Sequence, residues 1–176
     1  MKQLIPTYHA QNIYEVPVDF FTKVGIKNIL LDLDNTLAGH NVLVADDRTK
    51  NYVSQLLAKG FNIIIVSNNR GPRVSQYAQS LGVEYRANMK KPLKKRFVRI
   101  LSEKNFEKNA TILVGDQLFT DVFVANRVGI RSMLVEKLVD NDQWTTRFNR
   151  MFETPQRKRL KRNNHLKNWR EFYGTK

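Results

Sequence analysis

Short apolar runs alternate along this chain with segments of helical pattern, and this alternation constrains the fold more than any other feature. The run Asn62–Val66, for example, holds four aliphatic residues in succession, which is typical of a strand covered on both faces. Repeated strand–helix units predict an α/β fold of three layers, with a mostly parallel central sheet between helices. The pattern predicts strands over 28–33, 62–66, 83–86, 111–114 and 131–135, and helices over 46–59, 71–82, 94–103 and 119–128.

Lysine and arginine are concentrated in two segments. The 176 residues include 30 Lys or Arg and 16 Asp or Glu, a formal net charge of +14. Residues 86–108 hold nine basic and two acidic residues, residues 147–176 hold ten and two, and the remainder is close to neutral. Such basicity is typical of proteins that meet nucleic acid, an acidic lipid surface or phosphorylated ligands. Because the strand–helix pattern weakens after about residue 137, we expect a core domain over 1–146 and a basic C-terminal extension over 147–176.

The composition excludes several classes of protein. The chain has no cysteine, which excludes a disulfide scaffold, thiolate metal sites and cysteine nucleophiles. Its longest apolar runs fall far short of the roughly 20 residues that a membrane span needs, and residues 1–6 show no apolar core of a secretory signal. We therefore expect a cytoplasmic protein, bound at most peripherally to the inner face of the membrane.

Polar side chains follow the predicted strands at the points where the strands end. Two carboxylates follow the first strand, a hydroxyl and an amide follow the second, two more carboxylates follow the strand over 111–114, and a lysine precedes the basic helix. The carboxyl ends of parallel strands meet at one edge of the sheet, where ligands bind, so we expect these side chains to lie together. They are Asp32, Asp34, Ser67, Asn68, Lys91, Asp116 and Asp121.

These residue types favour phosphoryl transfer. Several carboxylates do not share a pocket in ionised form without a cation, and oxygen donors without His or Cys favour a hard ion, most simply Mg²⁺. One carboxylate can attack phosphorus to form an aspartyl-phosphate, while the cation, the lysine and the hydroxyl neutralise the phosphoryl oxygens. A second Asp two residues away can protonate the leaving oxygen and then activate water. The scattered His9, His40 and His165 have no metal-ligand spacing, and we expect none of them to bind metal.

The ordered set of motifs resembles a known superfamily. The run Asp32-Leu-Asp-Asn-Thr36 resembles the DxDxT motif of haloacid dehalogenase (HAD) phosphatases, whose Rossmann-like fold agrees with the predicted layers. Ser67 matches the second motif, Lys91 the third, and Gly115-Asp116 with Asp121 the fourth. Flanking residues are similar to the YqeG-like branch of subclass IIIA, which is related to the mitochondrial phosphatidylglycerophosphate phosphatases. Each motif alone also fits a solvated loop, a turn or a helix cap, so only their combination supports the assignment.

The resemblance implies a role for each matching residue. Asp32 would be the nucleophile and a Mg²⁺ ligand, and Asp34 the general acid and base, with its backbone carbonyl on the metal. Ser67 would bind the phosphoryl oxygens together with Asn68. The remaining roles are Lys91 holding nucleophile and phosphate, Asp116 and Asp121 completing the metal site, and Thr36 fixing the loop. Lys90 is the alternative to Lys91, but the family pattern places a proline after the lysine, as in Lys91-Pro92.

The gaps between the motifs leave no room for a cap domain. The interval 36–67 is taken up by a loop, a helix and a strand. The interval 67–91 has room only for a helix and a short strand. An open site can accept a phosphate that protrudes from something large. We therefore expect a Mg²⁺-dependent phosphomonoester phosphatase acting on phosphatidylglycerophosphate or another large or surface-bound phosphoester, with anionic lipid as a partner. The alternatives are a phosphatase for soluble nucleotide, sugar or protein phosphates, and an RNA- or ribosome-associated protein with secondary catalysis.

Aromatic residues interleave with basic ones near the end of the chain. We expect the aromatics from Trp144 to Phe152 to pack onto the domain. For 157–173, which include a possible helix over 165–172, two interpretations remain open: packing onto the domain, or an amphipathic segment on an anionic membrane or RNA.

Overall fold

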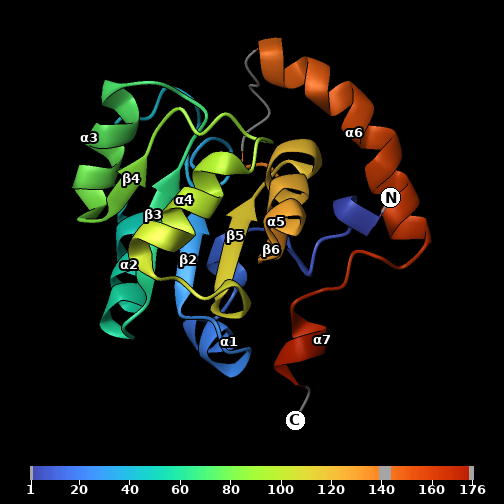
Figure 1. Ribbon diagram of the computed structural model, residues 1–176, viewed down its shortest axis with the longest axis horizontal. Coiled ribbons are helices and arrows are strands. Elements are labelled where there is room, and N and C mark those ends of the chain that lie inside the picture. Colours follow the sequence, from blue (N-terminus) through green and yellow to red (C-terminus); the bar gives the residue numbers. More distant parts are fainter. Residues whose placement is uncertain (1, 139–143, 175–176) are drawn as a thin grey trace.

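Six strands form one parallel sheet at the centre of the molecule (Figure 1). The computed structural model describes residues 2–138 and 144–174, with the backbone alone over 144–152. The strand order is β1-β6-β5-β2-β3-β4, and each neighbouring pair is parallel. The strands are β1 Tyr8–Ala10, β2 Asn28–Leu31, β3 Asn62–Val66, β4 Glu84–Arg86, β5 Thr111–Gly115 and β6 Arg131–Val135.

Helices cover both faces of this sheet and confirm the predicted three layers. Alternate residues of a strand point to opposite faces, so Ile29 and Leu31 of β2 join a core with α1, α2 and α3, while Leu30 joins a second core with α4 and α5. The helices are α1 Val18–Lys23, α2 Asp47–Ala58, α3 Pro72–Leu81, α4 Lys95–Lys104, α5 Phe123–Val128, α6 Trp144–Arg162 and α7 Arg170–Tyr173. Short helical turns cover η1 Lys2–Leu4, η2 Ile13–Glu15, η3 Lys108–Ala110 and the π-helical η4 Leu118–Val122.

The predicted elements between residues 28 and 135 are present, with small shifts. The prediction of one α-helix over 119–128 is wrong for its first residues. There the chain forms the π-helical turn η4, and α5 begins only at Phe123. The N-terminal β1 and α1 had no prediction, since a three-residue strand and a six-residue helix give little periodicity. Between β2 and β4 the chain spends its length on α2 and α3, so the predicted absence of a cap domain is confirmed.

The described part of the C-terminal extension packs on the domain. The proposed boundary at 146/147 falls inside α6, and the helix predicted over 165–172 is limited to α7. Trp169 is buried, and its ring lies 5.8 Å from that of Phe20. Its backbone N–H also donates to His9 O at 3.0 Å, at the open edge of β1. For Trp169 the structure therefore supports packing; the side chains of 144–152, for which packing was also expected, lie outside the described residues. Among the described helices, none combines the length and apolar character of a membrane span.

Candidate active site

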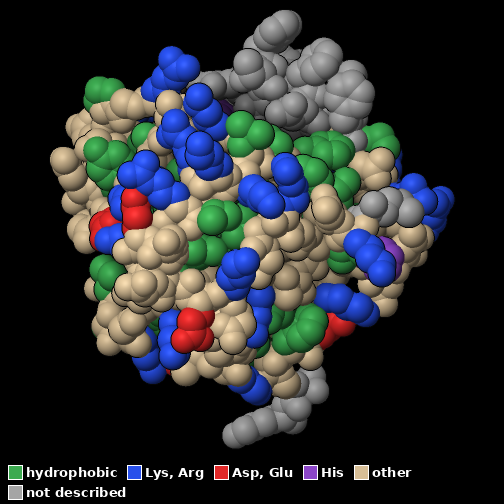
Figure 2. Space-filling view, in the orientation of Figure 1, with side chains coloured by type: hydrophobic (Ala, Val, Ile, Leu, Met, Phe, Trp, Pro, Cys, Tyr) green, Lys and Arg blue, Asp and Glu red, His purple; other side chains and the backbone are tan. Residues whose placement is uncertain are grey.

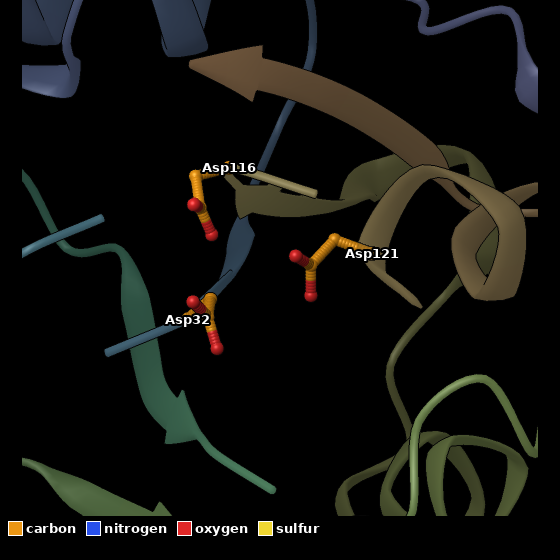
Figure 3. A group of neighbouring side chains, drawn as sticks. All are labelled: Asp32, Asp116 and Asp121. Carbon is orange, nitrogen blue, oxygen red and sulfur yellow. The ribbon is translucent and has the colours of Figure 1, made fainter. Parts of the chain in front are cut away.

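Three buried carboxylates converge at the carboxyl edge of the sheet (Figure 3). Asp32 follows β2, Asp116 follows its neighbour β5, and Asp121 lies in η4. One oxygen from each carboxylate lies within 4.8 Å of the others. The chain runs from β2 to β3 on one side and returns to β5 on the other, so the carboxylates lie at the point where the strand order reverses, which is where such sheets bind ligands.

A glycine allows the close approach of Asp121. A Cβ atom on Gly115 would lie 2.4 Å from Cγ of Asp121, a separation that no real side chain tolerates. The Asp121 carboxylate also accepts hydrogen bonds at 3.2 Å from the backbone N–H of Gln117 and the hydroxyl of Thr120. In the Gly-Asp motif, Gly115 therefore leaves room for Asp121, and Asp116 supplies a carboxylate.

Lys91 supplies the cation of the site. Its ammonium lies 2.5 Å from Asp32 Oδ1 and 2.7 Å from Asp121 Oδ1, whereas Lys90 is exposed. Asn68, predicted to bind substrate, holds the backbone of Lys91: its Oδ1 accepts from Lys91 N at 2.6 Å, and its Nδ2 donates to Lys91 O at 3.2 Å. Asn68 thus fixes the position from which the lysine reaches the carboxylates.

The charges of this cluster do not balance. Burial raises the pKa of Asp32 well above its ordinary value, and the carboxylates of Asp121 and Asp116 raise it further while Lys91 opposes them. Burial alone would lower the pKa of Lys91, but Asp121 and Asp32 together raise it above its ordinary value. One ammonium among three carboxylates leaves negative charge in a buried place, and a hard divalent cation would neutralise it. The donor set therefore fits Mg²⁺.

Asp34 lies in a second network beside these carboxylates. Its Oδ1 accepts hydrogen bonds from Arg73 Nη1 at 2.7 Å and from His40 Nδ1 at 3.1 Å. Its Oδ2 accepts from Ser67 Oγ at 3.2 Å and from Asn69 Nδ2 at 2.9 Å. Sequence reasoning missed both partners, although His40 lies in the loop after β2 and Arg73 lies in the first turn of α3, which follows β3.

Thr36 belongs to the loop that carries both aspartates. Its hydroxyl donates to Asp32 Oδ2 at 3.2 Å, which agrees with the structural role expected for it. The backbone N–H of Asp32 bonds to Val114 O at 2.9 Å, so the sheet ladder still holds the chain at this point. The nucleophile candidate therefore extends from a fixed backbone.

Helix α6 contacts the loop that carries Asp116. Arg157 donates from Nη2 to Asp116 O at 2.5 Å and from Nη1 to Glu136 Oε2 at 2.9 Å. The buried Glu153, one turn earlier in α6, accepts from the N–H of Phe119 in η4 at 3.1 Å. Sequence reasoning placed both residues in a basic extension, because no local pattern shows that α6 returns to the site.

The chain is similar to known phosphatases. A family model described as mitochondrial PGP phosphatase matches residues 1–140. The chain belongs to this phosphatase family. The probable phosphatase YqeG of Bacillus subtilis (strain 168) is 32% identical to this chain over 170 residues. The alignment covers 97% of this chain and 98% of that protein.

Solved structures show that this member of the PGP phosphatase family has the HAD-type fold. An uncharacterized protein from Listeria monocytogenes serotype 4b aligns with a TM-score of 0.54 and 21% identity, over 67% of this chain and 85% of that one. A putative HAD superfamily (subfamily III A) hydrolase from Legionella pneumophila aligns with a TM-score of 0.51 and 17% identity, over 69% and 71%. The predicted HAD-type phosphatase is thus confirmed as to family and fold.

Proposed function

We propose that the chain is a Mg²⁺-dependent phosphomonoester phosphatase that works through a phosphoaspartyl intermediate on Asp32. The observation that carries this proposal is the contact of Asp32 Oδ1 with Lys91 Nζ at 2.5 Å beside two further buried carboxylates. The Asp32 carboxylate is held by the Lys91 ammonium and lies next to two carboxylates that can bind a metal. This arrangement suits a nucleophile that must approach a negatively charged phosphoryl group.

The proposed reaction has two steps. Asp32 Oδ attacks phosphorus and the bond from phosphorus to the leaving oxygen breaks, while Asp34 gives a proton to that oxygen. Asp34 then takes a proton from water, which attacks the acyl phosphate and releases inorganic phosphate and free Asp32. Lys91 and the hydroxyl of Ser67 bind the phosphoryl oxygens. Arg73 and Ser67 donate hydrogen bonds to the carboxylate of Asp34 and hold it beside the site.

Mg²⁺ would be held by the side chains of Asp32 and Asp116 and the backbone carbonyl of Asp34, with Asp121 supporting them. When bound, it supplies positive charge that offsets the charge of the phosphoryl oxygens. The residues present fit this role because the three carboxylates share one small buried space.

Phosphatidylglycerophosphate is the leading substrate in this proposal. The description of the matching family supports it, as does the absence of a cap insertion between β2 and β4, a segment that the structure describes throughout. Soluble phosphomonoesters are the second candidate. A comparison of phosphate release from phosphatidylglycerophosphate vesicles and from p-nitrophenyl phosphate tests the substrate, and faster release from the soluble ester would contradict the lipid assignment.

Asp32→Asn tests the mechanism. The amide keeps the shape of the side chain but is not a nucleophile, so we expect the Mg²⁺-dependent rate to fall by about 10³-fold or more. Asp47→Asn is the matched control, because that carboxylate is almost fully exposed at the start of α2. A rate for the Asp32 variant close to that of the Asp47 variant would refute the proposed nucleophile.

A further inference from the structure

Exposed aliphatic side chains lie in two loops next to the site. Val42, Leu43 and Val44 follow one another and are 41%, 47% and 49% exposed, and Leu93 is 56% exposed. These four are half of the large hydrophobic residues that are exposed in the described part of the chain. Three consecutive exposed aliphatic residues contribute nothing to a core, and such a run is typical of a surface that binds something apolar.

Both loops are tied to residues of the site. The carbonyl of Val42 accepts a hydrogen bond from Arg73 Nε at 3.1 Å, and the same guanidinium binds Asp34. Leu93 comes two residues after Lys91, so its Cα lies within about 7 Å of that of the lysine. In Figure 1 the β2–α2 loop and the β4–α4 loop both project beyond the ends of the strand arrows. The two apolar tips therefore flank the site at the carboxyl edge.

Basic side chains surround these tips. Arg70, Lys90, Lys94 and Lys95 lie in the loops and at the start of α4; all four are exposed, and none forms an ion pair with a described acidic residue. Figure 2 shows blue side chains gathered along the same upper edge of the molecule. An acidic residue close to the first tip, Asp46, already caps α2 by accepting from Thr49 N at 2.8 Å. The edge around the site thus combines aliphatic tips with positive charge that has no partner within the described chain.

We propose that this edge, Val42–Val44 and Leu93 with the four surrounding cations, docks the protein on an anionic lipid membrane. Aliphatic tips enter the boundary between head groups and acyl chains, and the cations meet the anionic head groups. RNA would use the positive charge but would gain little from four exposed aliphatic side chains. The proposal rests on the proposed function in one respect: docking at this edge brings the phosphate of a lipid substrate to Asp32 without removing the lipid from the membrane.

Vesicle flotation of the full chain tests the docking edge. The vesicles contain phosphatidylcholine alone, or two parts phosphatidylcholine to one part phosphatidylglycerol. We expect binding to the anionic vesicles that weakens as salt is raised, and a loss of about tenfold or more in the double variant Leu43→Ser, Leu93→Ser. Leu57→Ser is the matched control, since Leu57 is 41% exposed but lies in α2 rather than at the docking edge.

Two further measurements separate docking from catalysis. The double variant should hydrolyse p-nitrophenyl phosphate at the wild-type rate, and Asp32→Asn should float like the wild type although it lacks activity. Equal flotation of the double variant and the wild type would overturn the docking proposal while leaving the proposed phosphatase intact. Binding to neutral vesicles as tight as to anionic ones, or tighter binding to single-stranded RNA with no effect of the double variant, would also overturn it.

Discussion

Arg157→Met tests whether α6 holds the proposed metal site in place. Methionine keeps much of the apolar length of the arginine stem but removes the guanidinium. The variant therefore loses the hydrogen bonds to Asp116 O at 2.5 Å and to Glu136 Oε2 at 2.9 Å, and the ion pair at 3.7 Å with the buried Glu153. Asp116 carries a proposed metal ligand, so the change acts one contact away from that ligand.

The structure gives the size of the expected effect. A hydrogen bond to a charged group contributes about 1.5–3 kcal/mol, and since the Arg157 side chain is 19% exposed we expect a loss of about 2–4 kcal/mol in the free energy of unfolding. For a chain of this size that corresponds to a fall in Tm of about 5–15 °C. Loss of a group that orients a metal ligand weakens metal binding by about 10-fold, or about 1.4 kcal/mol.

Two assays separate these effects. Mg²⁺ titration of the phosphatase rate gives the apparent metal affinity, and the Mg²⁺-induced rise in Tm gives it without substrate. Lys158→Met is the matched control, because Lys158 is the next residue of α6 and is exposed. A lower Tm with unchanged Mg²⁺ affinity would show that Arg157 stabilises the fold without orienting Asp116. No change in either quantity would refute the reasoning altogether.

Two further predictions concern the buried Lys91 and the contact of Glu15 with Trp169 and Arg170 near the end of the chain. Lys91→Met removes the ammonium from among the three carboxylates, and we expect a loss of about 3 kcal/mol in the free energy of unfolding in EDTA; Mg²⁺ should restore more stability to this variant than it adds to the wild type, as a thermal melt would show. Burial alone would raise the pKa of Glu15, but hydrogen bonds from Gln11 N and from the Arg170 and Trp169 side chains lower it below its ordinary value of 4.5. The stability that the ionised Glu15 gains from these hydrogen bonds is therefore present above pH 4.5 and is lost as pH falls through the lower pKa of the folded state. The difference in Tm between wild type and Glu15→Gln should then be largest near neutral pH and disappear in acid. A difference that grew in acid would contradict this assignment.

The central sheet and the acidic cluster were predictable because each depends on a local pattern. A run such as Asn62–Val66 can be buried on both faces only as a central strand, and a parallel sheet brings the residues after its strands to one edge. The proximity of Asp32 and Asp116 follows from that topology, because β2 and β5 are neighbours, whereas the approach of Lys91 and Asp121 also depends on the loop after β4 and on η4. The π-helical η4 was not predictable, because its apolar residues also fit the α-helix expected there.

Contacts between distant segments could not be read from the sequence in this way. Arg73 looks like an exposed residue in the first turn of a helix, yet it binds Asp34, and Arg157 looks like part of a basic tail, yet it binds the backbone of Asp116. Neither pairing has a periodicity or a fixed spacing, since each depends on how a loop or helix returns to the sheet. The sequence shows which residues could carry charge to the site, and only the three-dimensional arrangement shows which of them arrive.

The basic residues behind the net charge of +14 therefore fall into two kinds, those buried near the carboxylates and those exposed to solvent. Lys91 is buried against carboxylates and Arg157 is hydrogen-bonded beside them, so neither adds to the field that an approaching ligand meets first. The carboxylates outnumber the buried ammonium, and by themselves they would repel a phosphate. Exposed cations such as Lys90 and Lys94 at the same edge have the opposite sign and stand in water, where they attract anions over a distance of about 8–10 Å at ordinary ionic strength. Capture of an anionic surface and binding of a metal thus depend on separate groups, so a variant that loses one should keep the other.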